Sequence, residues 1–565
     1  MKIKVFNIYI TTLLLLIFQA EVQAQYGEPL KIPPHLSANF GELRNNHFHS
    51  GIDFKTQQVI NKPVYAVADG FVSRISVSPS GYGLAIYIDH PEMNQTSVYG
   101  HLNSFSTQIS EYVEDKQYEL ESFRVDIHLK PDEIPILKGE QIALSGNTGS
   151  SGGPHLHFEI RDTKTQSPLD PLQYVAQNVK DTQKPDLRAI AFYPINQQGV
   201  INGATVPTRL TISKSKSGNP LPLQKSIDAW GRIGVGVKAY DKMDGQANIY
   251  GVKHIRLFVD IKQVFSSTIN DYLFSETRML NSFVDFEDWR KNKSFFMKSF
   301  IEPGNKLRLY KSINRGYIDI NEERPYQMKY ELEDYFGNVA TYKFVVNGVL
   351  QEIPRKIKCE HFMSWQYYNK YTAYGFTLNI PEGNLYSDFC FTYNQEPDAV
   401  NKYHSDIHEV NKNPIPLHNN GKMWIKINSD TLQQRTKYGI VKINNNRDSW
   451  IGGTYKHGGL EVNINELGNK YAISIDTIPP TITPVSPQTW KQNGVIRINL
   501  SDNKSGVSYF RGTIDGQFML FKHDSKSNTY TYTFDRSRLA ELPIKSFKFS
   551  ARDGVGNESV YEYEF

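Results

Sequence analysis

Short extended segments separated by Gly and Pro turns fill the sequence from residue 26 to about residue 179. The clearest are Leu84–Asp89, Thr96–Tyr99 and Leu156–Ile160, which are rich in β-branched and aromatic residues and are bounded by turn residues. A charged, Tyr-rich stretch interrupts this pattern, and its Glu111–Ser122 portion predicts a helix. The segment as a whole therefore predicts a mainly β domain built from short strands.

Composition and length limit what the rest of the chain can be. At roughly 100–200 residues per domain, the 565 residues predict three or four folded domains. A content of 22% charged and 13% aromatic residues excludes a largely disordered chain. A net charge of +4 gives no indication of a nucleic-acid-binding surface. Two cysteines, Cys359 and Cys390, are too few for a disulfide framework or an all-cysteine zinc site.

The first 24 residues have the pattern of a secretory signal peptide. Lys2 and Lys4 precede the apolar run Ile8–Phe18, and small residues lead up to a cleavage position after Ala24. The alternative is a membrane anchor, but the run is shorter than the ~20 residues that span a bilayer. We expect export to the periplasm or cell envelope with no transmembrane span after cleavage. That compartment would permit Cys359 and Cys390 to pair.

Two short motifs carry the chemistry. His49 and Asp53 are four residues apart, and on an extended segment both side chains point to the same face. His155 and His157 likewise share a face, with Leu156 on the opposite, apolar face. Imidazole and carboxylate ligands suit zinc, and three protein ligands with an open fourth position mark a catalytic site. Zinc lowers the pKa of a bound water to about 7, which supplies a nucleophile at neutral pH.

The order of these motifs resembles a known family. His49 and Asp53 are followed by Tyr99–Leu102 and then by Gly146–Glu159, which contains the His-x-His pair. This combination closely resembles the lysostaphin/LytM-type zinc metallopeptidases, which cleave peptide bonds in bacterial peptidoglycan. The resemblance covers roughly residues 40–170 and implies an antiparallel lysostaphin-like β-sheet domain, the duplicated hybrid motif, over residues 25–179.

The resemblance also implies a role for each residue. His49, Asp53 and His157 are the expected ligands of one zinc ion. His101 and His155 are the expected catalytic imidazoles, one a general base and the other a group that steadies the oxyanion or protonates the leaving amine. Which imidazole takes which part is left open. Gly149–Pro154 is expected to form one wall of the substrate groove.

Other residues near these motifs have less specific interpretations. His47 is expected to be exposed or to support the ligands, and His90 to be structural. Glu159 is either a partner that orients an imidazole or an exposed strand carboxylate. Arg44 could contact a substrate carboxylate. Residues 103–135 could form a lid or rim over the groove.

The chain after residue 179 predicts three strand-rich modules. Residues 180–350 and 476–565 resemble bacterial immunoglobulin-like sandwiches, and residues 351–475 form another strand-rich module between them. The two sandwiches share three motifs, which pair as Asp181–Pro185 with Asp476–Pro480, Ala239–Gly245 with Leu500–Gly506, and Asp334–Asn338 with Asp553–Asn557. Asp502 and Asp553 could bind calcium or make only local hydrogen bonds at turns. The modules could contact the cell wall or a protein partner, or act as a spacer.

Two classes of function follow. The first is an exported zinc endopeptidase that hydrolyses peptide bonds in peptidoglycan stem peptides or cross-links. The second is a non-catalytic relative that binds peptidoglycan or activates an amidase; a zinc protease acting on a protein substrate is a smaller alternative. Since His49, Asp53, His101, His155 and His157 are all present, the sequence favours the enzyme.

Overall fold

The computed structural model describes residues 26–175, 178–354, 358–428, 430–432, 434–444, 447–539 and 544–565. The expected signal peptide, residues 1–24, lies outside the described residues. Within them, no helix is both long enough and apolar enough to cross a membrane. Several mainly antiparallel sheets follow one another along the chain, so the predicted mainly β fold is confirmed.

The first unit, residues 26–175, is built on one antiparallel sheet with the central order β1-β2-β10-β6-β5-β4-β7. Its eleven strands are β1 (Leu36–Ala38), β2 (Ile52–Lys55), β3 (Pro63–Tyr65), β4 (Gly70–Val77), β5 (Leu84–His90), β6 (Gln95–Phe105), β7 (Val125–His128), β8 (Pro135–Ile136), β9 (Gln141–Ser145), β10 (His155–Asp162) and β11 (Pro168–Leu169). The neighbouring strands β2, β10 and β6 lie near the middle of this order. They carry most of the predicted site residues.

Two helices accompany this sheet, α2 (Thr107–Glu119) and α3 (Leu172–Val175). Helix α2 begins and ends earlier than the predicted Glu111–Ser122. Its first residue directly follows Ser106, whose extended backbone marks the N-cap position. Ile109 and Val113 face the core from the first half of the helix. The prediction was therefore right about the helix and wrong about its limits.

Alternation along β10 separates an apolar face from a polar face. Leu156, Phe158 and Ile160 are completely buried in the core of the unit. His157 and Glu159 point the other way, as a two-residue period requires, and yet they are also buried. The polar face of the sheet is therefore covered, so His157 and Glu159 are largely shielded from water.

The second unit, residues 178–354, contains a ten-stranded sheet and two short helices. Its elements are β12 (Asp186–Ile201), β13 (Thr208–Thr211), β14 (Asp228–Tyr240), β15 (His254–Val259), β16 (Lys262–Thr268), α4 (Leu280–Phe283), α5 (Phe286–Asn292), β17 (Met297–Lys298), β18 (Tyr310–Ser312), β19 (Ile318–Ile320), β20 (Pro325–Glu333) and β21 (Val339–Gly348). All of its strand pairs are antiparallel except β14 with β21.

The third unit, residues 358–475, contains an eight-stranded sheet and a separate two-stranded one. Its strands are β22 (Phe362–Met363), β23 (Asn369–Ala373), β24 (Phe376–Ile380), β25 (Phe389–Cys390), β26 (Tyr393–Glu396), β27 (Ile407–Lys426), β28 (Tyr438–Ile443), β29 (Ser449–Gly452), β30 (Thr454–Lys456) and β31 (Gly459–Ile475). Cys359 and Cys390 form a disulfide beside the small sheet, a pairing that the sequence permitted but left open.

The fourth unit, residues 476–565, is a sandwich of a three-stranded and a four-stranded sheet. Its elements are β32 (Thr481–Pro484), α6 (Trp490–Asn493), β33 (Val495–Ser501), β34 (Val507–Ile514), β35 (Gln517–Met519), β36 (Thr529–Thr533), β37 (Ser546–Asp553) and β38 (Glu558–Glu564). Trp490, Ile498 and Phe549 belong to the apolar core of this unit.

The second unit packs directly against the first. The Tyr272 ring packs at a tilt against Phe48 with ring centroids 5.3 Å apart, and its hydroxyl donates a hydrogen bond of 3.0 Å to the Phe48 carbonyl. Lys253 Nζ lies 3.1 Å from Oδ2 of the buried Asp170. One continuous apolar cluster includes residues of both units. This interface covers the part of the chain that leads into β2.

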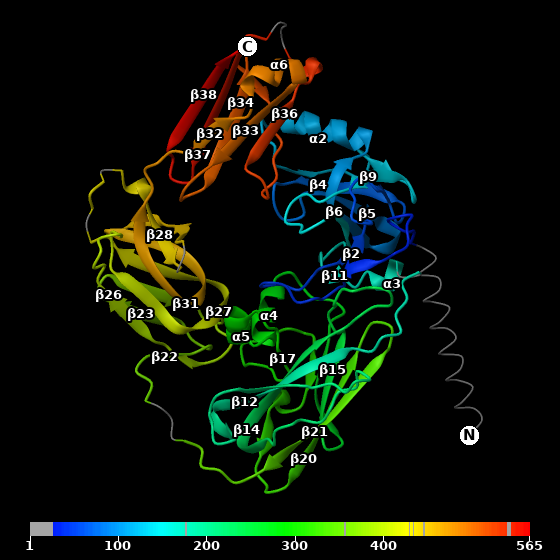
Figure 1. The fold of residues 1–565 in the computed structure, drawn as a ribbon, viewed down its shortest axis with the longest axis vertical. Helices are drawn as coiled ribbons and strands as arrows, with labels where there is room; N and C mark the ends of the chain where they lie inside the picture. The colour runs from blue at the N-terminus through cyan, green and yellow to red at the C-terminus, as the bar shows by residue number, and fades with distance from the viewer. Residues whose placement is uncertain are drawn as a thin grey trace, which may run out of the picture.

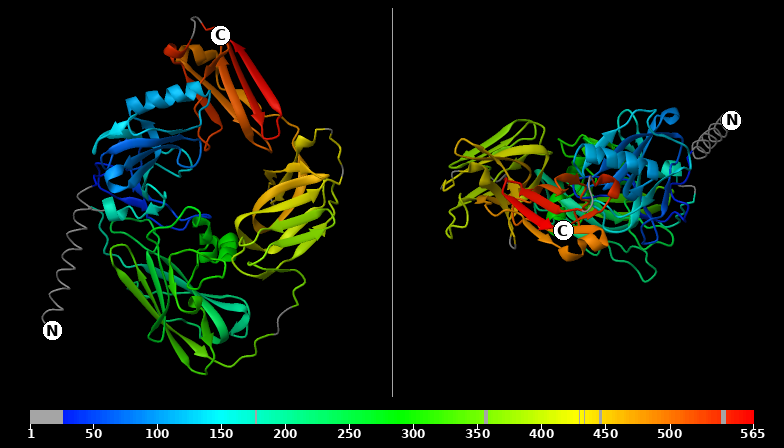
Figure 2. Two further views of the ribbon diagram at one scale, coloured as in Figure 1. Left: turned by 180° about the vertical axis from the view of Figure 1, so that it is seen from behind. Right: turned by 90° about the horizontal axis from the view of Figure 1, so that it is seen from above.

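The fourth unit returns to the first, and the four units follow one another around a ring (Figures 1 and 2). The ring is closed at α2 and the residues after it. Tyr118 packs edge-on against Phe518 with centroids 5.8 Å apart, and Arg511 Nη2 lies 2.8 Å from Glu121 Oε1. The last part of α2 and the residues directly after it are therefore docked on the fourth unit.

Candidate active site

The three expected metal ligands meet where β2 and β10 pair. His157 on β10 lies directly opposite Asp53 on β2, and on its other side it faces Gly100 on β6. His49 lies just before β2, in a segment that the second unit covers. Sheet register thus brings His157 to His49 and Asp53, which precede it in the sequence by more than a hundred positions.

The potential ligand atoms form a compact triangle. Asp53 Oδ1 lies 2.9 Å from His157 Nδ1 and 3.1 Å from His49 Nε2, and the two imidazole nitrogens are 3.1 Å apart. Bonds of 2.0–2.2 Å in a tetrahedral zinc site place ligand atoms about 3.3 Å apart, so the observed spacing is close to that of a formed site. Two imidazole nitrogens and one carboxylate oxygen are a donor set that zinc accepts.

In each of the two expected ligand imidazoles, the ring nitrogen that faces away from the triangle has a hydrogen-bond partner. His49 Nδ1 lies 2.8 Å from the Asn39 carbonyl oxygen, so it must carry the hydrogen and leave the Nε2 lone pair facing the triangle. His157 Nε2 lies 2.8 Å from Glu159 Oε1. Partners of this kind fix the ring orientation and the tautomer that a metal requires.

Without a metal, the three side chains of the triangle attract one another electrostatically. Burial lowers the pKa of His157, but hydrogen bonds and charge from Asp53 and Glu159 outweigh it and raise that pKa to about 9. Burial opposes ionisation of Asp53, but His49 and His157 hold the pKa of its carboxyl well below the usual range. A metal that enters the triangle must therefore displace the proton of His157, which couples metal binding to proton release.

Glu159 lies at the centre of a buried polar network beneath the triangle. Its Oε1 accepts hydrogen bonds from Ser50 Oγ at 2.7 Å and Tyr82 OH at 2.5 Å, and its Oε2 pairs with Arg161 Nε at 2.6 Å. The carboxylate is completely buried, so the structure decides between the two interpretations of Glu159. It supports His157 and is not an exposed strand carboxylate.

Glu159→Gln should lower the affinity for the metal by about 10–100-fold, because a neutral amide holds the His157 ring less firmly. Competition with a zinc chelator measures the zinc affinity. The thermal unfolding temperature of the variant measures the loss of stability that follows from breaking the ion pair between Glu159 and Arg161, so the two effects can be separated. Ser50→Ala is the matched control, since it removes one hydrogen bond to the same carboxylate and keeps its charge. Equal zinc affinities for Glu159→Gln and the unaltered protein would show that Glu159 does not position the ligand.

The two expected catalytic imidazoles lie beside the triangle. Their ring centroids are 4.8 Å apart, and His155 Nε2 lies 3.6 Å from Asp53 Oδ1. His101 Nδ1 is 2.8 Å from the Thr148 carbonyl oxygen, and His155 Nδ1 is 2.8 Å from the Gly153 carbonyl oxygen. Each Nδ1 must therefore carry the hydrogen, which leaves each Nε2 as a proton acceptor.

Burial keeps both of these imidazoles neutral near pH 7. Removal from water lowers the pKa of His101 to about 3, with a further contribution from His157 and His155. Burial also lowers the pKa of His155, although Asp53 opposes the shift. A neutral imidazole with a fixed tautomer is the form that can accept a proton.

The backbone of His101 is strained in a way that aims its side chain. Its φ of 57° lies in the left-handed region, which costs a non-Gly residue roughly 1–2 kcal/mol. Two features hold this conformation. The His101 N–H donates to the Tyr82 carbonyl at 2.8 Å, and Gly146 packs so closely that a Cβ there would lie 2.7 Å from the His101 carbonyl oxygen. Strain of this kind is concentrated at functional sites.

An open groove of about 670 Å³ runs over these residues. One wall includes Ser150, Ser151 and Gly152, so the expected position of the Gly-rich loop is confirmed. Phe274 and Thr277 of the second unit complete the lining. No described residue of the segment 103–135 lines the groove. The hypothesis that this segment forms a lid or rim over the groove is therefore wrong. That segment contacts the fourth unit instead.

The Gly-rich loop is held from its other side by the fourth unit. Asp524 Oδ2 accepts a hydrogen bond of 2.9 Å from the Gly149 N–H, and Lys526 Nζ donates to the carbonyl oxygens of Asn147 and Gly149 at 2.5 and 2.6 Å. Two residues more than 370 positions away in sequence thus hold one wall of the groove.

The remaining polar residues of the region take distinct places. His47 is exposed at the groove. Its recorded hydrogen bond is to the Asn45 carbonyl, and the structure records no contact between His47 and the triangle. His90 is buried, with its ring nitrogens 2.8 Å from the Asp69 carbonyl and from Ser97 Oγ, so its structural role is confirmed. Arg44 lines the groove, and its Nη2 lies 3.6 Å from Asp53 Oδ2. Its role toward substrate stays a prediction.

Sequence reasoning missed several members of the site. Arg161 could have been found, because it is two residues beyond Glu159 on the same face of β10. Tyr82 lies between two strands in a Gly-Tyr-Gly turn, and Phe274 belongs to another unit. Since these two reach the site only through long-range packing, no local pattern points to them.

Comparison with known proteins agrees with this geometry. Residues 47–118, which include His49, Asp53 and His101, match the family model described as Peptidase family M23. This match supports the expected LytM-type peptidase domain in the first unit. The family match ends within α2, before His155 and His157. Residues 360–476 match the model of a Zu5-like domain.

Individual relatives resemble this peptidase domain over a limited length. An uncharacterized metalloprotease of Haemophilus influenzae is 36% identical over 112 residues, 20% of this chain and 18% of the relative. The DD-carboxypeptidase/endopeptidase Mpg of Neisseria meningitidis serogroup B is 32% identical over 139 residues, 24% of this chain and 26% of the relative. The lysostaphin catalytic domain of Staphylococcus simulans is 22% identical with a TM-score of 0.19, over 25% of this chain and 90% of that one. The two relatives are thus matched over about a quarter of their length or less.

Proposed function

We propose that the chain is an exported zinc endopeptidase that hydrolyses peptide bonds in peptidoglycan stem peptides or cross-links. The observation that carries the proposal is the triangle of His49, Asp53 and His157 beside two neutral imidazoles in an open groove. The names of two relatives support the substrate class: a DD-carboxypeptidase/endopeptidase and a peptidoglycan DD-endopeptidase of Vibrio cholerae, the latter 29% identical over 139 residues. Action on the cell wall in turn supports export to the periplasm or envelope.

His49 Nε2, Asp53 Oδ1 and His157 Nδ1 would hold the zinc. When bound, zinc supplies Lewis acidity toward the scissile carbonyl and makes water a nucleophile at neutral pH. His101 and His155 each present an unprotonated Nε2. One accepts a proton from the attacking water, and the other stabilises the developing negative charge or passes a proton to the leaving amine.

The groove offers means to orient a peptide. The Gly-rich wall at Ser150–Gly152 exposes backbone and small side chains, which lets an extended peptide approach closely. Arg44 places a guanidinium at the groove beside the triangle, where it can attract a peptide carboxylate. Phe274 adds an apolar surface from the second unit.

The test is digestion of peptidoglycan fragments of defined cross-link by the purified protein, with products identified by mass spectrometry and zinc measured on the same sample. We expect about one zinc ion per chain and release of peptides from the cross-linked fragments. Zinc-loaded protein that binds peptidoglycan without cleaving it would contradict the endopeptidase and favour the binding or amidase-activating alternative. Cleavage of an unrelated protein but of no peptidoglycan fragment would contradict the substrate class.

A further inference from the structure

Three aspartates of the second unit converge away from the peptidase site. Asp181 lies in the linker before β12, Asp241 directly follows β14, and Asp334 follows β20. One carboxylate oxygen from each lies within 4.8 Å of an oxygen from each of the others. Asp241 and Asp334 are each only 2% exposed, so water cannot easily screen the repulsion between their carboxylates.

Two of these carboxylates have oxygens with no hydrogen-bond partner among the described residues. Asp241 is only 2% exposed, and its Oδ1 is one of these atoms; Asp181 Oδ2 is the other. A buried ionised oxygen without a donor is costly unless a proton or a cation compensates it. The unpartnered oxygen of Asp241 therefore points to a missing positive ligand rather than to a turn that is complete in itself.

The charged groups that act on Asp181 and Asp241 are themselves acidic. Burial and the neighbouring Asp334 and Asp181 raise the pKa of Asp241 to about 8. Burial, together with Asp334 and Asp244, raises the pKa of Asp181 to about 6. No described lysine, arginine or histidine forms an ion pair with Asp181, Asp241 or Asp334. Additional positive charge at this position would relieve the repulsion.

The fourth unit repeats the arrangement at corresponding places. Asp476 precedes β32, Asp502 follows β33, and Asp553 ends β37; one oxygen from each again lies within 4.8 Å of the others. Asp502 Oδ1 has no hydrogen-bond partner among the described residues. The six aspartates belong to the three pairs of motifs that the two sandwich-like units share in sequence. The repeated residues therefore converge in both units.

The linker is tied to the last turn in the same way in both units. Asn338 Nδ2 donates to the Asp181 carbonyl oxygen at 3.1 Å, and Asn557 Nδ2 donates to the Asp476 carbonyl oxygen at 3.1 Å. Each asparagine also donates to its own cluster, to Asp334 Oδ2 at 2.8 Å and to Asp553 Oδ2 at 2.6 Å. An ion in either cluster would therefore join a linker between units to two turns of the following sandwich.

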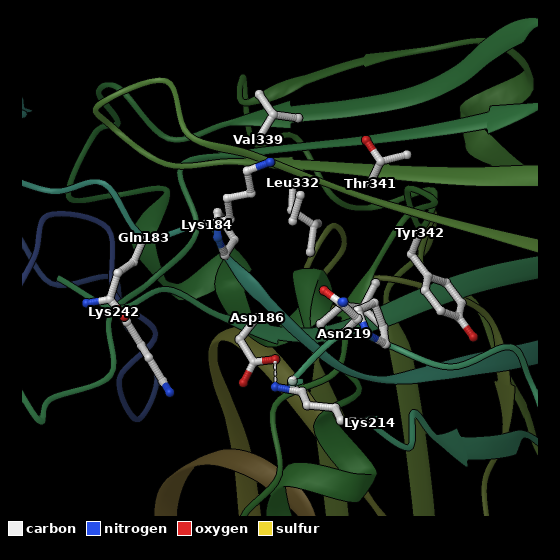
Figure 3. Close-up of a pocket in the computed structure, with 15 residues that line it drawn as sticks. Gln183, Lys184, Asp186, Lys214, Asn219, Lys242, Leu332, Val339, Thr341 and Tyr342 are labelled. Carbon is white, nitrogen blue, oxygen red and sulfur yellow. Dashed lines mark hydrogen bonds and ion pairs between the residues drawn. The ribbon is translucent and has the colours of Figure 1, made fainter. Parts of the chain in front are cut away.

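We propose that each aspartate cluster binds one calcium ion, at Asp181, Asp241 and Asp334 in the second unit and at Asp476, Asp502 and Asp553 in the fourth. Carboxylates without nitrogen or sulfur ligands select a hard cation, and calcium tolerates the irregular oxygen geometry that loops provide. Gln183 and Lys242, which flank two of the aspartates, line an adjacent hollow of about 570 Å³ on the second unit (Figure 3). Calcium at the first cluster would stiffen the linker between the peptidase domain and the second unit.

Isothermal titration of the full chain with calcium chloride, with its peptidase-site metal retained, tests the proposal. We expect about two calcium ions per chain. Asp241→Asn and Asp502→Asn should each reduce the number to about one, and the double variant should bind none. Both substitutions keep side-chain shape, and each removes a carboxylate that contains an unpartnered oxygen. Calcium should also raise the unfolding temperature of the unaltered chain by several degrees, and less in either variant.

Glu323→Gln is the matched control, because it removes an exposed carboxylate of the second unit and should leave two sites. Titration of the unaltered chain needs no variant to fold, so a variant that unfolds does not remove the test. Absence of calcium binding at millimolar concentration would overturn the proposal. So would two remaining calcium sites in the double variant, or magnesium binding that matches calcium binding in affinity and number.

Discussion

Replacing His157 with alanine should abolish zinc binding at the peptidase site and lower the cleavage of peptidoglycan peptides by roughly 10³-fold or more. His157 Nδ1 lies 2.9 Å from Asp53 Oδ1 and 3.1 Å from His49 Nε2, so its loss removes one vertex of the triangle. The ring is buried and opposes Asp53 across the sheet, so the register of β2 and β10 fixes this vertex of the triangle. Zinc content by mass spectrometry and cleavage rate are measured on the same preparation.

His47→Ala is the matched control for this variant. His47 is an exposed histidine at the same groove, and the structure gives it a hydrogen bond to the Asn45 carbonyl but no contact with the triangle. It should keep full zinc content. His157→Gln provides a second variant, since it fills more of the space between Asp53 and Glu159 and so limits the loss of packing. Full zinc and full activity in the His157 variants would show that the ligand assignment is wrong.

The two faces of the strands could be predicted from sequence because side chains alternate with a period of two. That rule placed Leu156 on the apolar face and grouped His155 with His157, and the structure confirms both. The same rule applied two residues farther would have added Arg161. Local periodicity therefore identifies which residues share a surface, as long as they lie on one strand.

Contacts between distant strands and units could not be predicted in this way. Tyr82 reaches Glu159 across the sheet, and Phe274 enters the groove from the second unit. Lys526 holds the carbonyl of Gly149 over a separation of 377 residues. Such contacts depend on how whole units pack, which no short motif encodes. The aspartates that the two sandwich-like units share illustrate the intermediate case: the repeat is visible in sequence, but their convergence is visible only in the structure.

His101→Ala and His155→Ala should each lower the cleavage rate by about 10²–10⁴-fold while the zinc content stays near one ion per chain. Both imidazoles are neutral because burial lowers their pKa values, and both present Nε2 beside the triangle without belonging to it. The contrast with His157→Ala is therefore qualitative: these variants lose proton transfer or charge stabilisation and keep the metal. His128→Ala, which changes an exposed histidine on β7, should retain both zinc and activity.

The relation between the two single variants distinguishes their roles from a merely structural effect. If one imidazole is the general base and the other acts on the oxyanion or leaving group, the double variant should lose less than the product of the two single losses, because the groups serve one reaction step. Since each truncation opens space at the groove, added imidazole should restore part of the rate only where a proton acceptor was lost. The pH profile of kcat/KM should change its acid limb in that same variant. Loss of zinc in either single variant, or unchanged rates in both, would contradict the assignment of His101 and His155 as catalytic residues.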